Sequence, residues 1–178
     1  MRSTLLTLIA ALALTACGPG KEVPADSLVE RGGLAYEVNE NDPFSGSAVS
    51  YYSNGQLAEK TTYKNGQRDG PFESYYDNGQ LEEKGTHKDG QRDGPFESYY
   101  DNGQLAEKTT YKDGRGHGAY ETYFYDGQLW RRGNYKDGQL DGAIESYYDN
   151  GQLRGRANYK DGELVGPAES YSRDGELE

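Results

Sequence analysis

Glycine recurs every 24 residues over most of the chain, and this period constrains the fold more than any other feature of the sequence. The recurring residues are Gly46, Gly70, Gly94, Gly118, Gly142 and Gly166. They begin five complete units and a shorter sixth one. A repeat of this length forms one supersecondary element, which buries its apolar side only by stacking on its neighbours. The sequence therefore predicts an elongated array.

Each complete unit has the pattern of a β-hairpin. In the second unit, a strand-like run rich in aromatic residues at 72–76 precedes Asn78-Gly79, and another run begins at Leu81. Asn-Gly favours a type I′ turn, whose two central residues both have positive φ. The second run ends at Asp89-Gly90, which begins the connection to the next unit. We expect two antiparallel strands per unit.

A two-residue loop at Asn-Gly determines which residues face each other across the hairpin. It places Tyr76 opposite Leu81. It also places a glutamate opposite a basic residue in four units: Glu73 with Lys84, Glu97 with Lys108, Glu121 with Arg132, and Glu145 with Arg156. Such pairs stabilise a sheet by roughly 0.2–1 kcal/mol each. The other face of the second unit then carries Phe72, Tyr76, Leu81, Gly85 and His87.

Two blocks recur from unit to unit, Tyr-Tyr-x-Asn-Gly-Gln-Leu and Tyr-Lys-Asp-Gly-x-x-x-Gly. They resemble the MORN-repeat variant of bacterial proteins, and the resemblance extends from about residue 36 to residue 178. It implies an all-β fold, an elongated twisted antiparallel sheet of stacked β-hairpin repeats. Residues 46–165 would form five repeats, 34–45 an N-terminal cap strand, and 166–178 a partial C-terminal repeat. At about 4.8 Å between strands, five repeats extend roughly 48 Å.

The N-terminal residues have the pattern of a secretion signal. Arg2 precedes an apolar stretch from Leu5 to Leu14. The stretch is shorter than the about 20 residues that span a bilayer, and it is typical of a signal peptide. Leu14-Thr15-Ala16-Cys17 resembles the lipobox of bacterial lipoproteins. The resemblance implies a signal peptide over residues 1–16, cleavage before Cys17 and acylation of Cys17 with chains such as palmitate. An ordinary signal peptide that contains a cysteine is the alternative.

These features predict a protein that is attached to a membrane of the cell envelope through lipid on Cys17. Several acyl chains hold a protein stably on a bilayer, whereas one chain gives marginal binding. Gly18 follows the cysteine, and Asp does not. In Gram-negative lipoproteins this resembles sorting to the outer membrane. Residues 17–33 contain two prolines and scattered charges without a period, so we expect a flexible tether after the acylated N-terminus.

Charge and residue types exclude several classes of function. The formal net charge is −11, which argues against nucleic acid as a partner, because phosphate binding requires clustered Lys and Arg. His87 stands where other units have Tyr, and His117 lies in a connection. Neither belongs to a catalytic arrangement. The turns lack the acidic spacing of calcium loops. We therefore expect no enzyme activity, no cofactor and no metal.

The fourth unit has the densest group of aromatic and cationic residues. It holds the single tryptophan of the chain, Trp130, and the register above places Trp130 opposite Tyr123. Binding hot spots favour Trp, Tyr and Arg. Neutral variation within one repeat is the alternative explanation. The candidate binding residues are Tyr120, Tyr123, Tyr125, Trp130, Arg131 and Arg132.

Three functions fit these features. The first is a membrane-anchored scaffold that binds a protein partner, since repeat arrays offer long faces for recognition. The second is binding of glycan or cell-wall polymer through the aromatic residues. The third is an antitoxin-type role, a label that some MORN-variant proteins carry, although a cytosolic antitoxin should not have a lipobox. A homodimer is a further hypothesis, because one row of the sheet is apolar: Phe72, Phe96, Tyr120 and Ile144.

Overall fold

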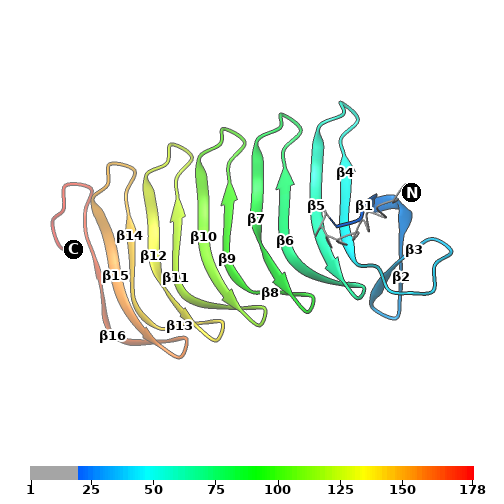
Figure 1. Ribbon diagram of the computed structural model, residues 1–178. Coiled ribbons are helices and arrows are strands. Elements are labelled where there is room, and N and C mark those ends of the chain that lie inside the picture. Colours follow the sequence, from blue (N-terminus) through cyan, green and yellow to red (C-terminus); the bar gives the residue numbers. More distant parts are fainter. Residues whose placement is uncertain (1–19) are drawn as a thin grey trace, which may run out of the picture.

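The computed structural model describes residues 20–178, which form one long β-sheet with a small hairpin at its N-terminal end (Figure 1). The strands lie side by side in chain order. The main path of the sheet is β1 (Glu22–Pro24), β4 (Gly46–Tyr51), β5 (Leu57–Lys64), β6 (Gln67–Tyr75), β7 (Leu81–Lys88), β9 (Gly94–Tyr99), β10 (Leu105–Lys112), β11 (Arg115–Tyr123), β12 (Leu129–Lys136), β14 (Gly142–Tyr147), β15 (Leu153–Lys160) and β16 (Glu163–Ser170).

Neighbouring strands of the repeats are antiparallel, and β1 adds to β4 in parallel at the N-terminal edge. Two short strands, β8 (Gln91–Arg92) and β13 (Gln139–Leu140), extend the pairing of β7 and β12. This architecture confirms the prediction of an all-β array of stacked hairpins. Because strands of the repeats pair only with their neighbours in sequence, each repeat is held by the repeats on either side of it.

The glycine that opens each unit bends the first strand of that unit. Gly70, Gly94, Gly118 and Gly142 have φ values of 121°, 97°, 94° and 101°. Such values favour glycine because it has no Cβ. The pairing slips by two residues nearby, for example between Thr109 and Tyr111, and a bulge of this kind bends a strand. The 24-residue period is therefore the period of a bend, and the strands in Figure 1 curve together.

The two turns of each repeat differ in geometry, and the type I′ turn predicted at Asn-Gly occurs at the other turn instead. In the Asn78-Gly79 turn only Gly79 has positive φ, and its N–H donates to the Tyr76 carbonyl. This is a three-residue loop, a type I turn followed by a left-handed glycine. At Asp89-Gly90 both residues have positive φ, 48° and 83°, which is the type I′ pattern.

The extra residue in the first turn changes part of the predicted register. Tyr75, and not Tyr76, lies opposite Leu81. Beyond the bulge all four glutamates face the basic residues that the sequence predicted. The ion pairs, however, form with the following repeat: Lys84 with Glu97 at 2.9 Å, Arg132 with Glu145 at 2.6 Å, and Arg156 with Glu169 at 2.7 Å. These charges therefore connect repeats.

The core is a row of buried side chains on one face of the sheet, which we call the inner face. Phe72, Phe96, Tyr120 and Ile144 hold the same place in successive repeats, and each is at most 8% exposed. Rings from the second strands lie between them. The His87 ring lies 5.5 Å from both Phe72 and Phe96, centroid to centroid. Because this row is buried within one chain, it no longer argues for dimerisation, which stays a prediction.

Residues 20–33 are ordered differently from the flexible tether that we expected. β1 lies against β4, where Val23 is 8% exposed and Glu22 pairs with Lys60 at 2.7 Å. A single 3-10 turn, η1 (Ala25–Ser27), and the hairpin of β2 (Leu28–Arg31) and β3 (Leu34–Glu37) follow. Phe44, 3% exposed, packs on Tyr63 and closes the core row. These contacts are single events without a period, so the sequence pattern did not reveal them.

Candidate binding site

The six candidate residues of the fourth repeat do not form one site. Tyr120 belongs to the core, 4% exposed, with its ring 4.7 Å from that of Tyr135. Burial raises the pKa of Tyr120. Tyr120 therefore supports the sheet.

Tyr123 and Arg132 lie on the outer face, where each is committed to a carboxylate. The Tyr123 hydroxyl donates to Glu121 Oε2 at 2.6 Å, and burial together with this bond raises the pKa of Tyr123 to about 12. Arg132 Nε donates to Glu145 Oε2 at 2.6 Å. Other repeats have the same tyrosine bond, as between Tyr99 and Glu97. Both residues therefore serve the regular pairing of the array.

The prediction that Trp130 faces Tyr123 is wrong. Leu129 lies opposite Tyr123, because the three-residue turn moves the register by one. Trp130 sits at the bulge, 43% exposed, with its ring 6.0 Å from that of Phe124. Tyr125, 56% exposed, extends from the turn toward the preceding repeat and donates to Asp101 Oδ1 at 2.8 Å. Tyr125 is thus held against the preceding repeat.

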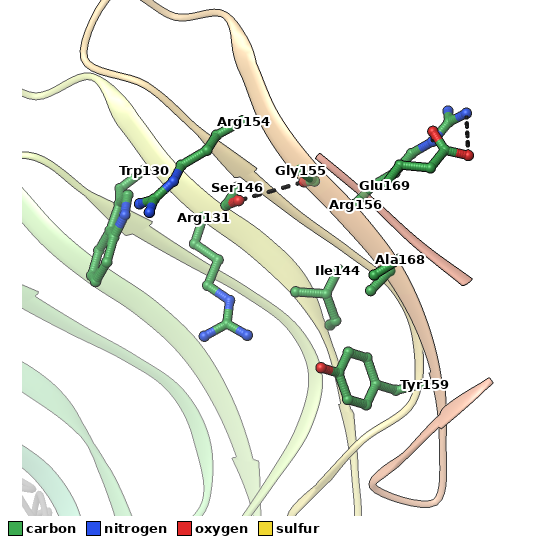
Figure 2. Close-up of a pocket in the computed structure, with 11 residues that line it drawn as sticks. Trp130, Arg131, Ile144, Ser146, Arg154, Gly155, Arg156, Tyr159, Ala168 and Glu169 are labelled. Atoms are coloured by element: carbon green, nitrogen blue, oxygen red, sulfur yellow. Dashed lines mark hydrogen bonds and ion pairs between the residues drawn. The ribbon is translucent and has the colours of Figure 1, made fainter. Parts of the chain in front are cut away.

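Trp130 and Arg131 line an open pocket of about 290 Å³. Figure 2 shows them on the same side of the sheet as Ile144, whereas Arg156 and Glu169 pair on the other side. Tyr159 and Ala157 complete the lining, and Arg154 lies near Trp130 (Figure 2). The pocket is open because its wall in the sixth unit is Ala168, at the place that Phe72 and Phe96 hold in the second and third repeats.

Sequence reasoning missed Arg154, although a signal was present. Arg154 holds the same place in its repeat as Trp130. The first three repeats have Ala58, Glu82 and Ala106 there. Comparing the same position in successive repeats, instead of searching for a local concentration of aromatic residues, would have grouped Arg154 with Trp130.

Two rows of hydrogen bonds connect the turns of successive repeats. In one row the turn asparagine donates to a main-chain carbonyl of the next repeat, as Asn78 does to Asp101 at 2.9 Å. In the other row a tyrosine hydroxyl does the same, as Tyr76 does to Tyr99 at 2.7 Å. The fourth repeat has Asp126 and Phe124 at these places. An ionised carboxylate and a phenyl ring have no donor, so both rows are interrupted before the fifth repeat.

Restoring the turn donor should stabilise the array. We expect Asp126→Asn to raise the free energy of unfolding by about 0.5–1.5 kcal/mol, the usual net contribution of one hydrogen bond. The new amide would donate to the carbonyl of Asp149, as Asn102 donates to that of Tyr125. Urea unfolding followed by circular dichroism measures the change. The control, Asn102→Asp, should lower stability by a similar amount, and equal stability of wild type and Asp126→Asn would contradict this role.

His87 is the one histidine within the core row. It is 8% exposed, and its Nδ1 has no hydrogen-bond partner within residues 20–178. Burial lowers the pKa of His87, and the positive charges of Arg68 and Arg92 lower it further, against a smaller opposing effect of Glu59. The fold therefore favours the neutral ring, in a place where the other full repeats have tyrosine.

Stability should consequently fall on mild acidification. A histidine whose pKa is lowered by folding destabilises the folded state once the pH falls below its unfolded value of about 6.5. We expect His87→Tyr to remove this loss between about pH 7 and pH 5.5, above the range in which carboxylates titrate. The urea midpoint at each pH measures it, with His117→Gln on the surface as control. If His87→Tyr and wild type lost stability in parallel over this range, the assignment would be wrong.

Two further observations concern other classes of site. Among residues 20–178, no group of three or more His, Cys, Asp or Glu side chains is placed to hold a metal ion. The same part of the chain has no helix that is both long and apolar enough to cross a membrane. Cys17, the predicted lipidation residue, lies outside the described residues, so its acylation stays a prediction.

The fold defines a class of protein, the single-sheet arrays of β-hairpin repeats. The chain belongs to the MORN repeat variant family, which matches residues 45–65, 68–89, 92–113, 116–137 and 140–161, more than half of the chain. This confirms the resemblance drawn from the recurring blocks.

Comparisons with individual proteins add little. No curated protein matches the chain. Among solved structures it is similar to the crystal structure of the GtfA/B complex bound to UDP and GlcNAc, with 17% sequence identity, 76% of this chain covered and a TM-score of 0.25. The chain spans 24% of the length of that protein. A likeness this distant carries no argument about function.

Proposed function

We propose that this chain is a lipid-anchored scaffold of the cell envelope that binds a protein partner along the inner face of its repeats. The observation that supports this most is the regular joint between repeats. Ring packing in the core and the two rows of turn hydrogen bonds hold successive hairpins in one arrangement. A pre-organised surface loses little conformational entropy on binding, which favours affinity. Membership of a repeat family supports the same role.

The anchor in this proposal is Cys17. The first strand of the array, β1, begins at Glu22, so only residues 18–21 separate the acylated cysteine from the sheet. Four extended residues reach roughly 14 Å. The array would therefore stay near the membrane surface, and its partner would be a protein of the same membrane or of the adjacent space.

Metabolic labelling with palmitate tests the anchor. We expect wild-type protein to incorporate the label and to fractionate with membranes, and Cys17→Ser to lose both properties, because the thiol is the only one in the chain. The matched control is Thr15→Ser, which keeps a small residue before the cysteine and should still be labelled. Unlabelled wild-type protein in the cytoplasm would overturn the proposal and favour the antitoxin-type role.

Glycan binding is a second candidate, favoured by the exposure of Trp130 and Tyr125, 43% and 56%. Exposed aromatic rings suit sugar stacking. Retention of the protein on purified cell-wall polymer that is lost in Trp130→Ala would favour this candidate over a protein partner.

A further inference from the structure

One place in the repeat changes charge along the inner face. The first three repeats have Glu59, Glu83 and Glu107 there, and the fourth has Arg131. The fifth has Gly155, next to Arg154. The inner face thus carries a glutamate at this place in the first three repeats and an arginine at or beside it in the fourth and fifth, although the whole chain carries a net charge of −11.

The two arginines of the cationic part have no carboxylate partner. In residues 20–178, neither Arg131 nor Arg154 has a carboxylate oxygen within 4.0 Å, whereas their neighbours Arg132 and Arg156 both form ion pairs on the outer face. In the second repeat the glutamate at the place of Arg131 is itself paired, Glu83 with Arg92 at 2.7 Å. Guanidinium groups that lack a carboxylate partner in an acidic protein are available to an external anion.

Both arginines stand around the pocket described above. Ile144, Ala157 and Tyr159 line it and form its apolar floor, and Trp130 stands beside Arg154 at its rim (Figure 2). A volume of about 290 Å³ lies just below the range of ligand sites, about 300–1,000 Å³. It accommodates a side chain of a partner better than a whole cofactor. An apolar floor below two fork-shaped cations fits an apolar group that is flanked by carboxylates.

We infer that this pocket binds an acidic peptide segment of the partner, with an apolar side chain on Ile144 and carboxylates on Arg131 and Arg154. The inference rests on the proposed function, and it specifies the chemistry of the partner. The adjoining glutamates at 59 and 107 repel an extended polyanion, such as an anionic membrane surface, but leave room for a ligand whose negative charge is confined to two or three residues.

The single tryptophan of the chain is a built-in reporter of the pocket. The purified full chain is titrated with the end-blocked peptide Glu-Phe-Glu-Phe-Glu while Trp130 fluorescence is followed. We expect a saturable change that weakens with added salt. The neutral peptide Gln-Phe-Gln-Phe-Gln should bind at least about tenfold more weakly, because its groups cannot form charge-assisted bonds with guanidinium.

Variants of adjacent arginines give a matched comparison. The double variant Arg131→Gln with Arg154→Gln should weaken binding at least about tenfold. Arg132→Gln, one residue away but on the outer face, should leave binding unchanged. A urea midpoint close to that of wild type shows that each variant is folded. Equal binding of the acidic and neutral peptides, or an equal loss in Arg132→Gln, would refute the inference.

Lipid vesicles test whether the pocket binds an anionic lipid headgroup instead of a peptide. If phosphatidylglycerol vesicles produced the arginine-dependent change and the peptide did not, the peptide assignment would be wrong. The outcome is independent of the palmitate experiment, since labelling reports on Cys17 and this titration reports on the pocket. Either can fail while the other succeeds.

Discussion

Replacing Phe96 with alanine should lower the free energy of unfolding by about 3–5 kcal/mol, the largest effect that we expect from a single substitution. Phe96 is 4% exposed, and its ring lies 5.5 Å from His87 and 5.4 Å from Tyr111. It therefore contributes to the joint with the preceding repeat as well as to its own hairpin. A single-layer sheet has no second layer that could move in to fill the cavity.

An exposed aromatic residue on a strand provides the control for this substitution. Tyr51 is 60% exposed, and Tyr51→Ala should change stability by less than about 0.5 kcal/mol, as is usual for surface positions. Urea unfolding by circular dichroism compares the two, and amide hydrogen exchange shows whether the loss is concentrated at the second and third repeats. Equal losses in Phe96→Ala and Tyr51→Ala would show that the core row does not hold the array together.

Adding a methyl group at Gly133 should cost about 1–3 kcal/mol, because it overpacks the core. A Cβ at this residue would lie 2.2 Å from Ile144 Cδ1 and 2.9 Å from Tyr120 Cε1. The backbone of Gly133 is extended and paired with Tyr120. Alanine is therefore excluded there by contact and not by backbone conformation.

A second substitution distinguishes steric overlap with Ile144 from other causes of a lower free energy of unfolding. Ile144→Val removes the Cδ1 atom with which the new methyl group collides, and alone it should cost about 0.5–1.5 kcal/mol. The double variant Gly133→Ala with Ile144→Val should then lose clearly less than the sum of the two single losses, since contacting sites couple. Urea unfolding of the four proteins in this cycle measures the coupling energy. Strictly additive losses would place the cost of Gly133→Ala elsewhere.

Features that recur could be predicted from the sequence. The hairpin repeats, the pairing of glutamates with basic residues, and the shared face of Phe72, Gly85 and His87 follow from a strict period and from the alternation of side chains along a strand. The prediction of the turn type was wrong because it used only the intrinsic preference of Asn-Gly for type I′. The side chain of Asn78 is required to reach the next repeat, and an interaction between repeats is invisible in one unit.

Features that occur once could not be predicted in the same way. The pocket depends on Ala168 being small and on the bulge that turns Trp130 away from Tyr123. The six candidate binding residues of the fourth repeat were predicted to form one site because they are close together in the sequence. The sheet divides them between a core place, an outer face and an inner face, because neighbouring residues on a strand point to opposite sides.

The contacts between successive repeats are nearly uniform, so the length of the array is proportional to the number of repeats. Removing one 24-residue unit removes two strands and shortens the sheet by about 9.6 Å, while the cap near Phe44 and the pocket near Trp130 keep their own contacts. The distance between the N-terminal cap and the pocket is thus set by the number of copies of a unit. Among residues 46–165, the junction after the fourth repeat differs from the others, because Asp126 and Phe124 interrupt both rows of turn hydrogen bonds there.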